Sequence, residues 1–361
     1  MNRSFIARNP SVLIFLAILA LFTLGVTVLS EGFGIGLIST SFVKVLGKTL
    51  CLCLIAIAMD LIWGYTGILS LGHFAFFGLG GYMIGMWLMY ERTRQIVVNS
   101  LSDGVLPPTP EEITAGIGNQ IFGVALVFGW LAFRSRVTGV YLSILTQAMT
   151  LGLSLYLFQN ASGLRGNNGL SGLQNLPGIT APQSVVSLWF FWASALALGL
   201  GYLLVAWVVS GKFGSVIRGI RDNEARVRFL GYSVETYKLA VFTLTACISG
   251  IAGALYYPQA GIINPAEVAP IASIYLAVWV AIGGRGRLYG AVIGTAFVSL
   301  VSSWFTGGQA PDVPLGFYTV KWVDWWLVLL GLSFVLVTLY APNGIGGLID
   351  LLKRKRKETD A

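Results

Sequence analysis

The sequence predicts an all-α integral membrane protein, a polytopic bundle of about ten transmembrane helices, and three observations lead to this fold class. Of the 361 residues, 56% belong to the hydrophobic set and only 11% are charged, against roughly 25% in an average soluble domain. The 45 glycines and 11 tryptophans fit a membrane bundle, where glycine lets helices approach closely and tryptophan gathers at the interfaces. Because a spanning helix needs about 20 residues, the chain has room for about ten spans in one domain. This composition excludes a water-soluble enzyme and an intrinsically disordered chain.

Long apolar runs give the expected spans in chain order. Arg3 and Arg8 precede the first run, which exceeds the roughly 7–15 residues of a signal-peptide core, so we interpret it as a retained first span. Two later runs are short and are separated by Gly283-Gly284-Arg285-Gly286. They are either two tilted spans or a pair of half-helices, so about eight to ten full crossings are expected. The predicted spans are residues 12–29, 45–63, 67–90, 116–133, 137–158, 187–209, 239–257, 270–283, 289–305 and 325–340.

Lysine and arginine favour the cytoplasmic segments of membrane proteins, and their distribution predicts the orientation. With the N-terminus inside and ten spans, the inside segments hold 17 of these residues and the outside segments hold 6. Both termini are therefore expected in the cytoplasm, with the whole chain, 1–361, forming one transmembrane domain. The basic tail, 341–361, is expected to lie near the anionic lipid bilayer. Two outside connections, 91–115 and 159–186, contain proline and glycine and are interpreted as loops.

The remaining composition argues against several kinds of site. The net charge of +8 comes from basic residues dispersed among apolar runs, which excludes a nucleic-acid-binding surface. Cys51, Cys53 and Cys247 lie in apolar runs and the chain has one histidine, so no disulfide framework or multi-histidine metal site is expected. Gly47-Lys48-Thr49 lacks the earlier glycine of a phosphate-binding loop. No catalytic constellation lies in the spans, so we expect no catalytic residue, metal or cofactor, and any ATP must be bound by another subunit.

The most informative inside segment is residues 212–236. Asp222 or Asn223 can cap a helix start, and Glu224 in the first turn suits the positive helix end. Gly231 can end this helix in a left-handed conformation, and Ser233 with Glu235 then begins the next span. The pattern predicts a short helix across the cytoplasmic face.

Two interpretations of this short helix stay open. Val227 and Leu230 are three residues apart on one side of it, and Arg226 and Arg228 are available to solvent or to a partner. The segment is either a charged loop that obeys the inside rule or a docking helix for a cytoplasmic motor.

A second segment, residues 63–82, carries glycines and a histidine within apolar sequence. Exposed backbone at membrane depth is tolerated only where it is buried in protein or faces a water-filled cavity. The segment therefore predicts a broken helix that lines a pathway, where transporters place substrate sites. Asp60 and His73 are the nearest ionisable residues. Alternatively, Asp60 faces water at a helix end and His73 only bonds a neighbouring helix.

These segments resemble the permease subunits of branched-chain amino acid type ABC importers, over about residues 45–348. Further stretches are similar to the urea-transporting branch of that family. The matching motifs are Tyr65-Thr66-Gly67-Ile68-Leu69-Ser70-Leu71-Gly72-His73 and Arg221-Asp222-Asn223-Glu224 to Leu230-Gly231 for the family, and Gly166-Asn167-Asn168-Gly169-Leu170, Pro258 to Pro265, Trp279 to Gly286 and Trp304-Phe305-Thr306 for the branch.

The resemblance implies a ten-helix importer fold like that of the vitamin B12 permease, in a bacterial inner membrane. It also implies a heterodimer with a homologous permease subunit, two cytoplasmic ATPase subunits and a periplasmic substrate-binding protein. Alternating access would be driven through contacts between the ATPases and the segment near 222–231, with Val227 and Leu230 inserting. The residues expected to couple to the ATPases are Arg218, Arg221, Asp222, Asn223, Glu224, Arg226, Val227, Arg228, Leu230 and Gly231.

Urea is small, planar and uncharged, so a site for it needs amide, hydroxyl or backbone partners and no charged clamp. The candidate pathway residues are Tyr65, Ser70, His73, Gln259 and Asn264, with Trp279 as a wall. Asn264-Pro265 is also a natural turn, and Gln259 could instead cap the preceding helix.

Other functions stay open at this point. The same machinery could carry branched-chain or other amino acids, whose charges would favour Asp60 or Glu267 in the pathway. An ion-coupled secondary transporter or a passive urea channel would need neither a docking helix nor an ATPase. A membrane enzyme lacks any catalytic constellation in this sequence.

Overall fold

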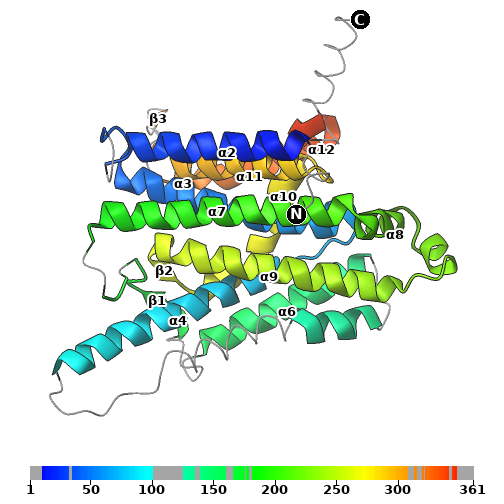
Figure 1. Ribbon diagram of the computed structural model, residues 1–361, viewed down its shortest axis with the longest axis horizontal. Coiled ribbons are helices and arrows are strands. Elements are labelled where there is room, and N and C mark those ends of the chain that lie inside the picture. The colour runs from blue at the N-terminus through cyan, green and yellow to red at the C-terminus, as the bar shows by residue number, and fades with distance from the viewer. Residues whose placement is uncertain are drawn as a thin grey trace, which may run out of the picture.

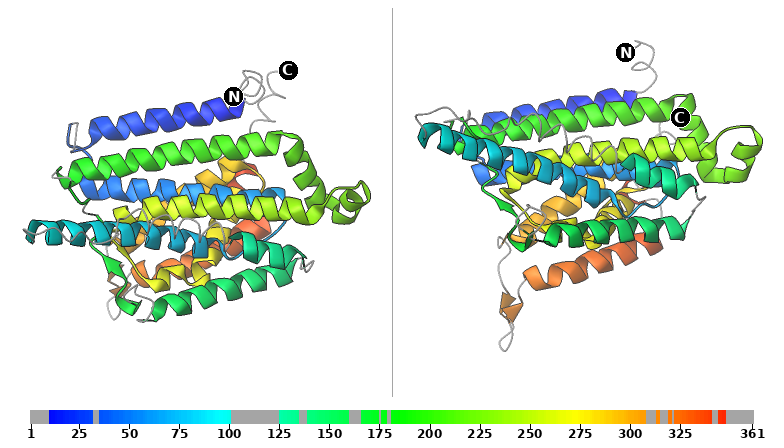
Figure 2. Two further views of the ribbon diagram at one scale, coloured as in Figure 1. Left: turned by 60° about the horizontal axis from the view of Figure 1, so that its bottom comes forward. Right: turned by 90° about the horizontal axis from the view of Figure 1, so that it is seen from below.

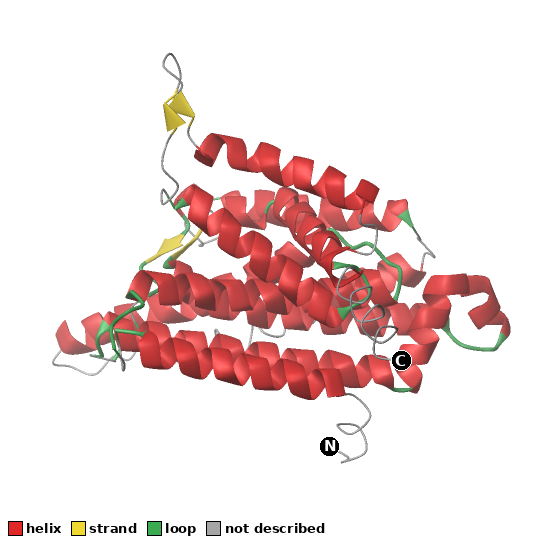
Figure 3. Ribbon diagram, turned by 90° about the horizontal axis from the view of Figure 1, so that it is seen from above, coloured by secondary structure: helices red, strands yellow, loops and turns green. Residues whose placement is uncertain are grey.

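The computed structural model shows a bundle of long helices (Figure 1). Its strands are short and lie at one end of the bundle (Figure 3). The basic residues of the predicted tail lie outside the described residues. The structure describes residues 10–31, 35–100, 125–134, 139–159, 166–174, 176–178, 181–307, 313–314, 319–320, 322–340 and 344–347.

Within these described ranges the helices follow the predicted spans closely. Six are long and apolar enough to cross a membrane, and three shorter apolar helices and the 28-residue α4 complete the set of ten expected spans. The prediction of an all-α membrane bundle is confirmed. The long elements are α2 (Pro10–Leu29), α3 (Thr40–Asp60), α4 (His73–Ser100), the helix Ala125–Arg134, α6 (Val140–Phe158), α7 (Gln183–Ser210), α8 (Lys212–Phe229), α9 (Val234–Ala260), α10 (Pro270–Gly283), α11 (Leu288–Thr306) and α12 (Trp322–Tyr340).

The other elements are short. They are the π-helix η1 (Leu61–Tyr65), the 3-10 helices η3 (Gly166–Asn168) and η4 (Pro265–Val268), and the strands β1 (Leu170–Ser171), β2 (Ile262–Ile263), β3 (Val313–Pro314) and β4 (Thr319–Val320). Strands β1 and β2 pair antiparallel, as do β3 and β4.

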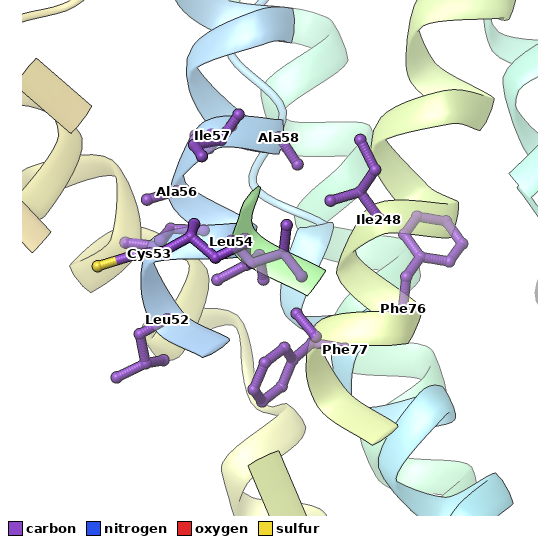
Figure 4. Close-up of a cluster of buried hydrophobic side chains, with 14 of the residues drawn as sticks. Leu52, Cys53, Leu54, Ala56, Ile57, Ala58, Phe76, Phe77 and Ile248 are labelled. Atoms are coloured by element: carbon purple, nitrogen blue, oxygen red, sulfur yellow. The ribbon is translucent and has the colours of Figure 1, made fainter. Parts of the chain in front are cut away.

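Helix α3 forms the centre of the bundle. In its span 89% of the residues are buried, against 11% in the span of α2, so α2 leaves most of its apolar surface outside the packed bundle. Side chains of α3 meet Phe76 and Phe77 of α4 and Ile248 of α9 in one apolar cluster (Figure 4). Helices α4 and α9 lie with their backbones in contact, since a side chain at Gly80 or Gly253 would collide with the facing chain.

The predicted span 67–90 differs from the structure at its start. The chain leaves α3 through η1, runs without helical structure from residue 66 to 72, and begins α4 only at His73. Hydroxyl groups on the buried face of α6 satisfy the exposed backbone of this interruption. Ser143 Oγ donates to the Leu69 carbonyl at 2.7 Å, and Thr146 Oγ1 accepts from the Leu71 amide at 3.0 Å. The predicted broken helix is thus present, and protein covers it on the α6 side.

Two further boundaries correct the expectations. Residues 91–100 continue α4 as helix, whereas the sequence pattern placed them in an outside loop. Helix α10 has 14 residues and is therefore about 21 Å long, too short to cross the roughly 30 Å hydrocarbon layer alone. The segment 261–269, with β2 and η4, precedes it at the end where β1 pairs with β2.

The bundle has one distinctive end. Helix α8 joins α7 to α9 and projects beyond the neighbouring helices (Figure 2). The start of α2 and the end of α12 lie at this same end, whereas β1 and β2 lie at the opposite one (Figures 1 and 2).

Replacing the Thr146 hydroxyl tests how the interruption is stabilised. Thr146→Val keeps the side-chain shape but leaves the Leu71 amide without its acceptor in an apolar interior. We expect a loss of about 1–3 kcal/mol of stability and a melting temperature a few degrees lower in detergent. The matched control is Thr23→Val, since the exposed Thr23 hydroxyl bonds only its own helix. Equal melting temperatures for the two variants would contradict this role for Thr146.

Candidate functional site

The projecting helix α8 is two helical pieces joined at Asn223. Asn223 has a non-helical backbone, with φ −160° and ψ 95°, and its Oδ1 accepts from the Arg226 amide at 3.0 Å. This is the geometry of a helix N-cap, at one of the two positions that the sequence predicts. The second piece ends at Gly231, whose φ of 88° is left-handed, as predicted. Helix α9 then begins at Val234, after Ser233.

A network of charged side chains ties α8 to the start of α9. Arg228 donates to Glu235 at 2.7 Å and to Glu224 at 2.9 Å. Lys238, whose side chain is only 7% exposed, donates to the second oxygen of Glu224 at 2.7 Å. Hydrogen bonds to Glu235 and Glu224 raise the pKa of the Arg228 guanidinium above its ordinary value. The sequence left Arg228 available to solvent or to a partner; in the structure it is half-exposed and already binds two carboxylates, so it stabilises the α8–α9 hairpin.

The apolar residues of the second piece separate into an inner and an outer set. Val227 is buried and packs with Ile220 and Val234, so it is not on the surface as the sequence pattern suggested. Phe229 and Leu230 are 91% and 71% exposed at the outer end of α8. Phe229 was missed at the sequence level, because helical spacing from Val227 does not show which face the hairpin covers. We call Arg226, Phe229 and Leu230 the outer tip.

Residues of the first piece of α8 face the bundle. Arg221 Nη1 donates to the carbonyl of Gly64 in η1 at 2.9 Å, and Arg221 Nε pairs with the exposed Asp222 at 3.1 Å. Arg218 lies within electrostatic reach of Tyr65, the last residue of η1. The predicted coupling residues are thus brought together on one projecting hairpin, but they point in different directions. Their contact with an ATPase stays a prediction.

A polar cavity of about 240 Å³ lies between α8, the interruption and the start of α9. Charged residues of both signs line it, and each of them has a partner within the chain. Its lining includes Thr66, Gly67, Arg221, Glu224 and Lys238.

Of the predicted pathway residues, Ser70 lies in the interruption and His73 begins α4 directly after it. Both are fully buried. Among the described residues, neither the Ser70 hydroxyl nor the His73 ring nitrogens make a hydrogen bond of standard geometry, although the Ser70 backbone lies beside the ring. The hydroxyl of Ser273 on α10 accepts from the Phe74 amide at 3.2 Å and so fixes the start of α4. Tyr65 lies apart, half-buried at the end of η1.

The other predicted pathway residues are distributed over the bundle. Gln259, near the end of α9, donates to Ser194 of α7 at 2.9 Å and to the Leu255 carbonyl at 2.7 Å. Asn264 accepts from the Glu267 amide at 3.3 Å and caps η4, which is its turn interpretation. Trp279 of α10 packs against α11 and α12. The structure therefore does not gather the six pathway residues into one pocket, and their roles stay predictions.

The sequence did not predict one pair of oppositely charged residues in the half of the bundle opposite α8. Lys48 of α3 lies within electrostatic reach of Glu267 in η4, and Glu267 bonds Tyr257 of α9. The two residues are 219 positions apart in the chain, so spacing gives no signal for their meeting.

The comparisons with known proteins identify the family. The family model for the permease component of branched-chain amino acid transport systems matches residues 41–338. The permease LivM of the high-affinity branched-chain amino acid system of Salmonella typhimurium is 23% identical over 331 residues, covering 86% of this chain and 71% of the relative. The probable LivM permease of Methanocaldococcus jannaschii is 24% identical over 312 residues, covering 83% and 84%.

A more distant group is also similar. The autoinducer 2 import permease LsrC of Escherichia coli is 26% identical over 226 residues, covering 60% of this chain and 65% of the relative. No solved structure matches the chain. The family model spans most of the chain, including the interruption and α8, so this protein belongs to the branched-chain amino acid transport system permease family and is an ABC-type membrane permease subunit, not an enzyme.

Proposed function

We propose that this permease subunit serves an ATP-driven importer of urea that works by alternating access. Two separate ATPase subunits bind at the outer tip, and a homologous permease subunit completes the membrane part. A periplasmic binding protein delivers the solute to the end where β1 and β2 lie. The end that bears α8, the start of α2 and the end of α12 faces the cytoplasm of a bacterial cell.

The exposed apolar end of α8 carries the proposal of ATPase docking. Phe229 and Leu230 are exposed at the outer end of α8, and α8 projects beyond the neighbouring helices (Figure 2). Such apolar surface is unfavourable in water unless a partner covers it. The ion pairs of Glu224 hold this hairpin against α9, so a push on the outer tip moves a stiff unit. Driving alternating access requires contacts of this kind that differ between two states.

The chemistry of the unpartnered buried groups supports urea. The buried Asp60 and Lys238 and the half-buried Glu267 each have at least one partner within the chain, whereas the second oxygen of Asp60 has none among the described residues. Neutral groups remain without a hydrogen-bond partner among the described residues, and they include Ser70 Oγ, Trp279 Nε1 and Gln259 Oε1. These groups offer donors and acceptors but no net charge, which suits a small neutral solute with both kinds of group.

Amino acids are a second candidate substrate class. Two of the relatives described above are named as branched-chain amino acid permeases. In addition, Lys48 and Glu267 place charges of both signs in the half of the bundle opposite α8. A zwitterion could exchange these partners for its own carboxylate and ammonium groups.

Substitution of Leu230 tests the docking role. Leu230→Asp places a charge where apolar contact is proposed, and burying a leucine side chain is worth about 1.5–3 kcal/mol. We expect the affinity for the ATPase pair to fall about ten-fold or more, measured by co-purification of the complex in detergent. ATP-dependent uptake should fall with it, while membrane insertion stays unchanged.

The matched control for this variant is Leu37→Asp. Leu37 is 73% exposed, close to the 71% of Leu230, but lies before α3 at the opposite end of the bundle. The Leu37→Asp variant should co-purify with the ATPase pair as well as the unsubstituted subunit does. Retention by both variants would exclude the outer tip as the docking surface.

Uptake by the reconstituted importer tests the substrate. Proteoliposomes with the complete complex should accumulate labelled urea only with ATP, and labelled leucine weakly or not at all, because most of the unpartnered buried groups of the described residues are neutral. ATP-dependent uptake of leucine without urea would establish the amino acid alternative. Accumulation of urea without ATP would instead indicate a passive channel.

A further inference from the structure

The inner end of α3 is tied to two separate segments of the same end of the bundle. Asp60, the last residue of α3, is fully buried, and its Oδ1 accepts from the Gly286 amide in the α10–α11 turn at 2.6 Å. The Arg285 guanidinium lies over the Trp63 ring, 5.3 Å from its centroid. On the other side, Arg221 of α8 bonds the Gly64 carbonyl. All three contacts converge on η1, the joint between α3 and the interruption.

The Arg221 contact satisfies a specific electrostatic need of this joint. Helical structure ends at Tyr65, where the regular ladder of backbone hydrogen bonds stops. The amides of Ile68 and Gly67 still bond the carbonyls of Ile62 and Trp63, whereas the Gly64 carbonyl accepts from Arg221. The end of a helix also carries a partial negative charge, which favours a cation there. Arg221 supplies both the donor and the charge, and it comes from a residue 157 positions away in the chain.

The stem of Arg221 also packs on the interruption itself. Gly67 has a φ of +78°, and a Cβ there would lie 2.7 Å from Arg221 Cγ, so only glycine leaves room for this side chain. One arginine therefore contacts both the end of η1 and the first residues of the interruption. A displacement of α8 moves the hydrogen-bond partner of the joint as well as a packing surface.

We propose that Arg221 is a positioning residue that transmits movement of α8 to η1 and residues 66–72. This inference rests on the proposed function, because it assumes that ATPases move α8. It separates two tasks on one hairpin. The outer tip receives the ATPase, and Arg221, which faces inward, sets the conformation of the interruption. A π-helix suits such a joint, because π turns inside helices occur frequently at functional sites.

Substitution of Arg221 in the assembled importer tests this transmission. Arg221→Gln removes the charge and most of the reach, so ATP hydrolysis and ATPase binding should persist while urea uptake per ATP falls about ten-fold, the size expected for one charge-assisted hydrogen bond. Arg221→Lys keeps a cationic donor and should therefore show a urea uptake per ATP between those of Arg221→Gln and the unsubstituted subunit. Lys212→Gln makes the same charge change at the exposed start of α8 and should leave the ratio unchanged.

A labelling experiment gives a readout that lost stability would not imitate. A cysteine at Ile68, in the interruption, should change its reaction rate with maleimide when ATP is added to the complex, relative to the parent chain. With Arg221→Gln this dependence on ATP should disappear.

Unchanged uptake per ATP in Arg221→Gln, or an unchanged response of the label to ATP in that variant, would overturn the inference. Loss of the ATPases would also overturn it, because Arg221 would then belong to the docking surface. ATP-independent uptake by the unsubstituted complex would instead contradict the proposed function.

Discussion

In an apolar medium every backbone amide and carbonyl must find a partner, and the interruption between α3 and α4 shows how much of this structure follows from that requirement. Helix α6 buries a stripe of hydroxyl side chains, although its opposite face is apolar and exposed. Two members of this stripe bond the free backbone of the interruption: Ser143 bonds the Leu69 carbonyl, and Thr146 bonds the Leu71 amide. Ser273 does the same for the first turn of α4. The broken helix is possible because side chains of two neighbouring helices, α6 and α10, supply hydrogen-bond partners that its own backbone lacks.

The same requirement connects the membrane part to the projecting hairpin. The Gly64 carbonyl near the end of η1 accepts from Arg221 of α8, and the amide of Gly286 donates to Asp60. These bonds join three stretches of chain that are distant in sequence. The hairpin itself is held by Glu224, which bonds both Arg228 and the buried Lys238. A permease that is moved by separate ATPases needs such a stiff lever with a defined inner contact.

Much of the architecture could be predicted because local sequence carries it. The apolar runs predict the spans within a few residues for the described helices, since only a continuous helix satisfies its backbone in lipid. The cap at Asn223 and the turn at Gly231 follow from the chemistry of those two residues. The sequence did not predict that α4 begins at His73, because Phe74 and the residues after it are as apolar as those of a continuous span.

The sequence by itself determined that this chain is a membrane bundle, roughly where it crosses, and where the second piece of its projecting helix begins and ends. The tertiary structure decided which side chains of that helix face outward. Val227 packs beneath the hairpin and Phe229 projects, a distinction that depends on how α9 covers α8. It also decided which groups meet across the bundle, such as Arg221 with Gly64 and Lys48 with Glu267. The physical reason is that a helix period and a cap act over a few residues, whereas burial and pairing depend on segments that the chain brings together only by folding.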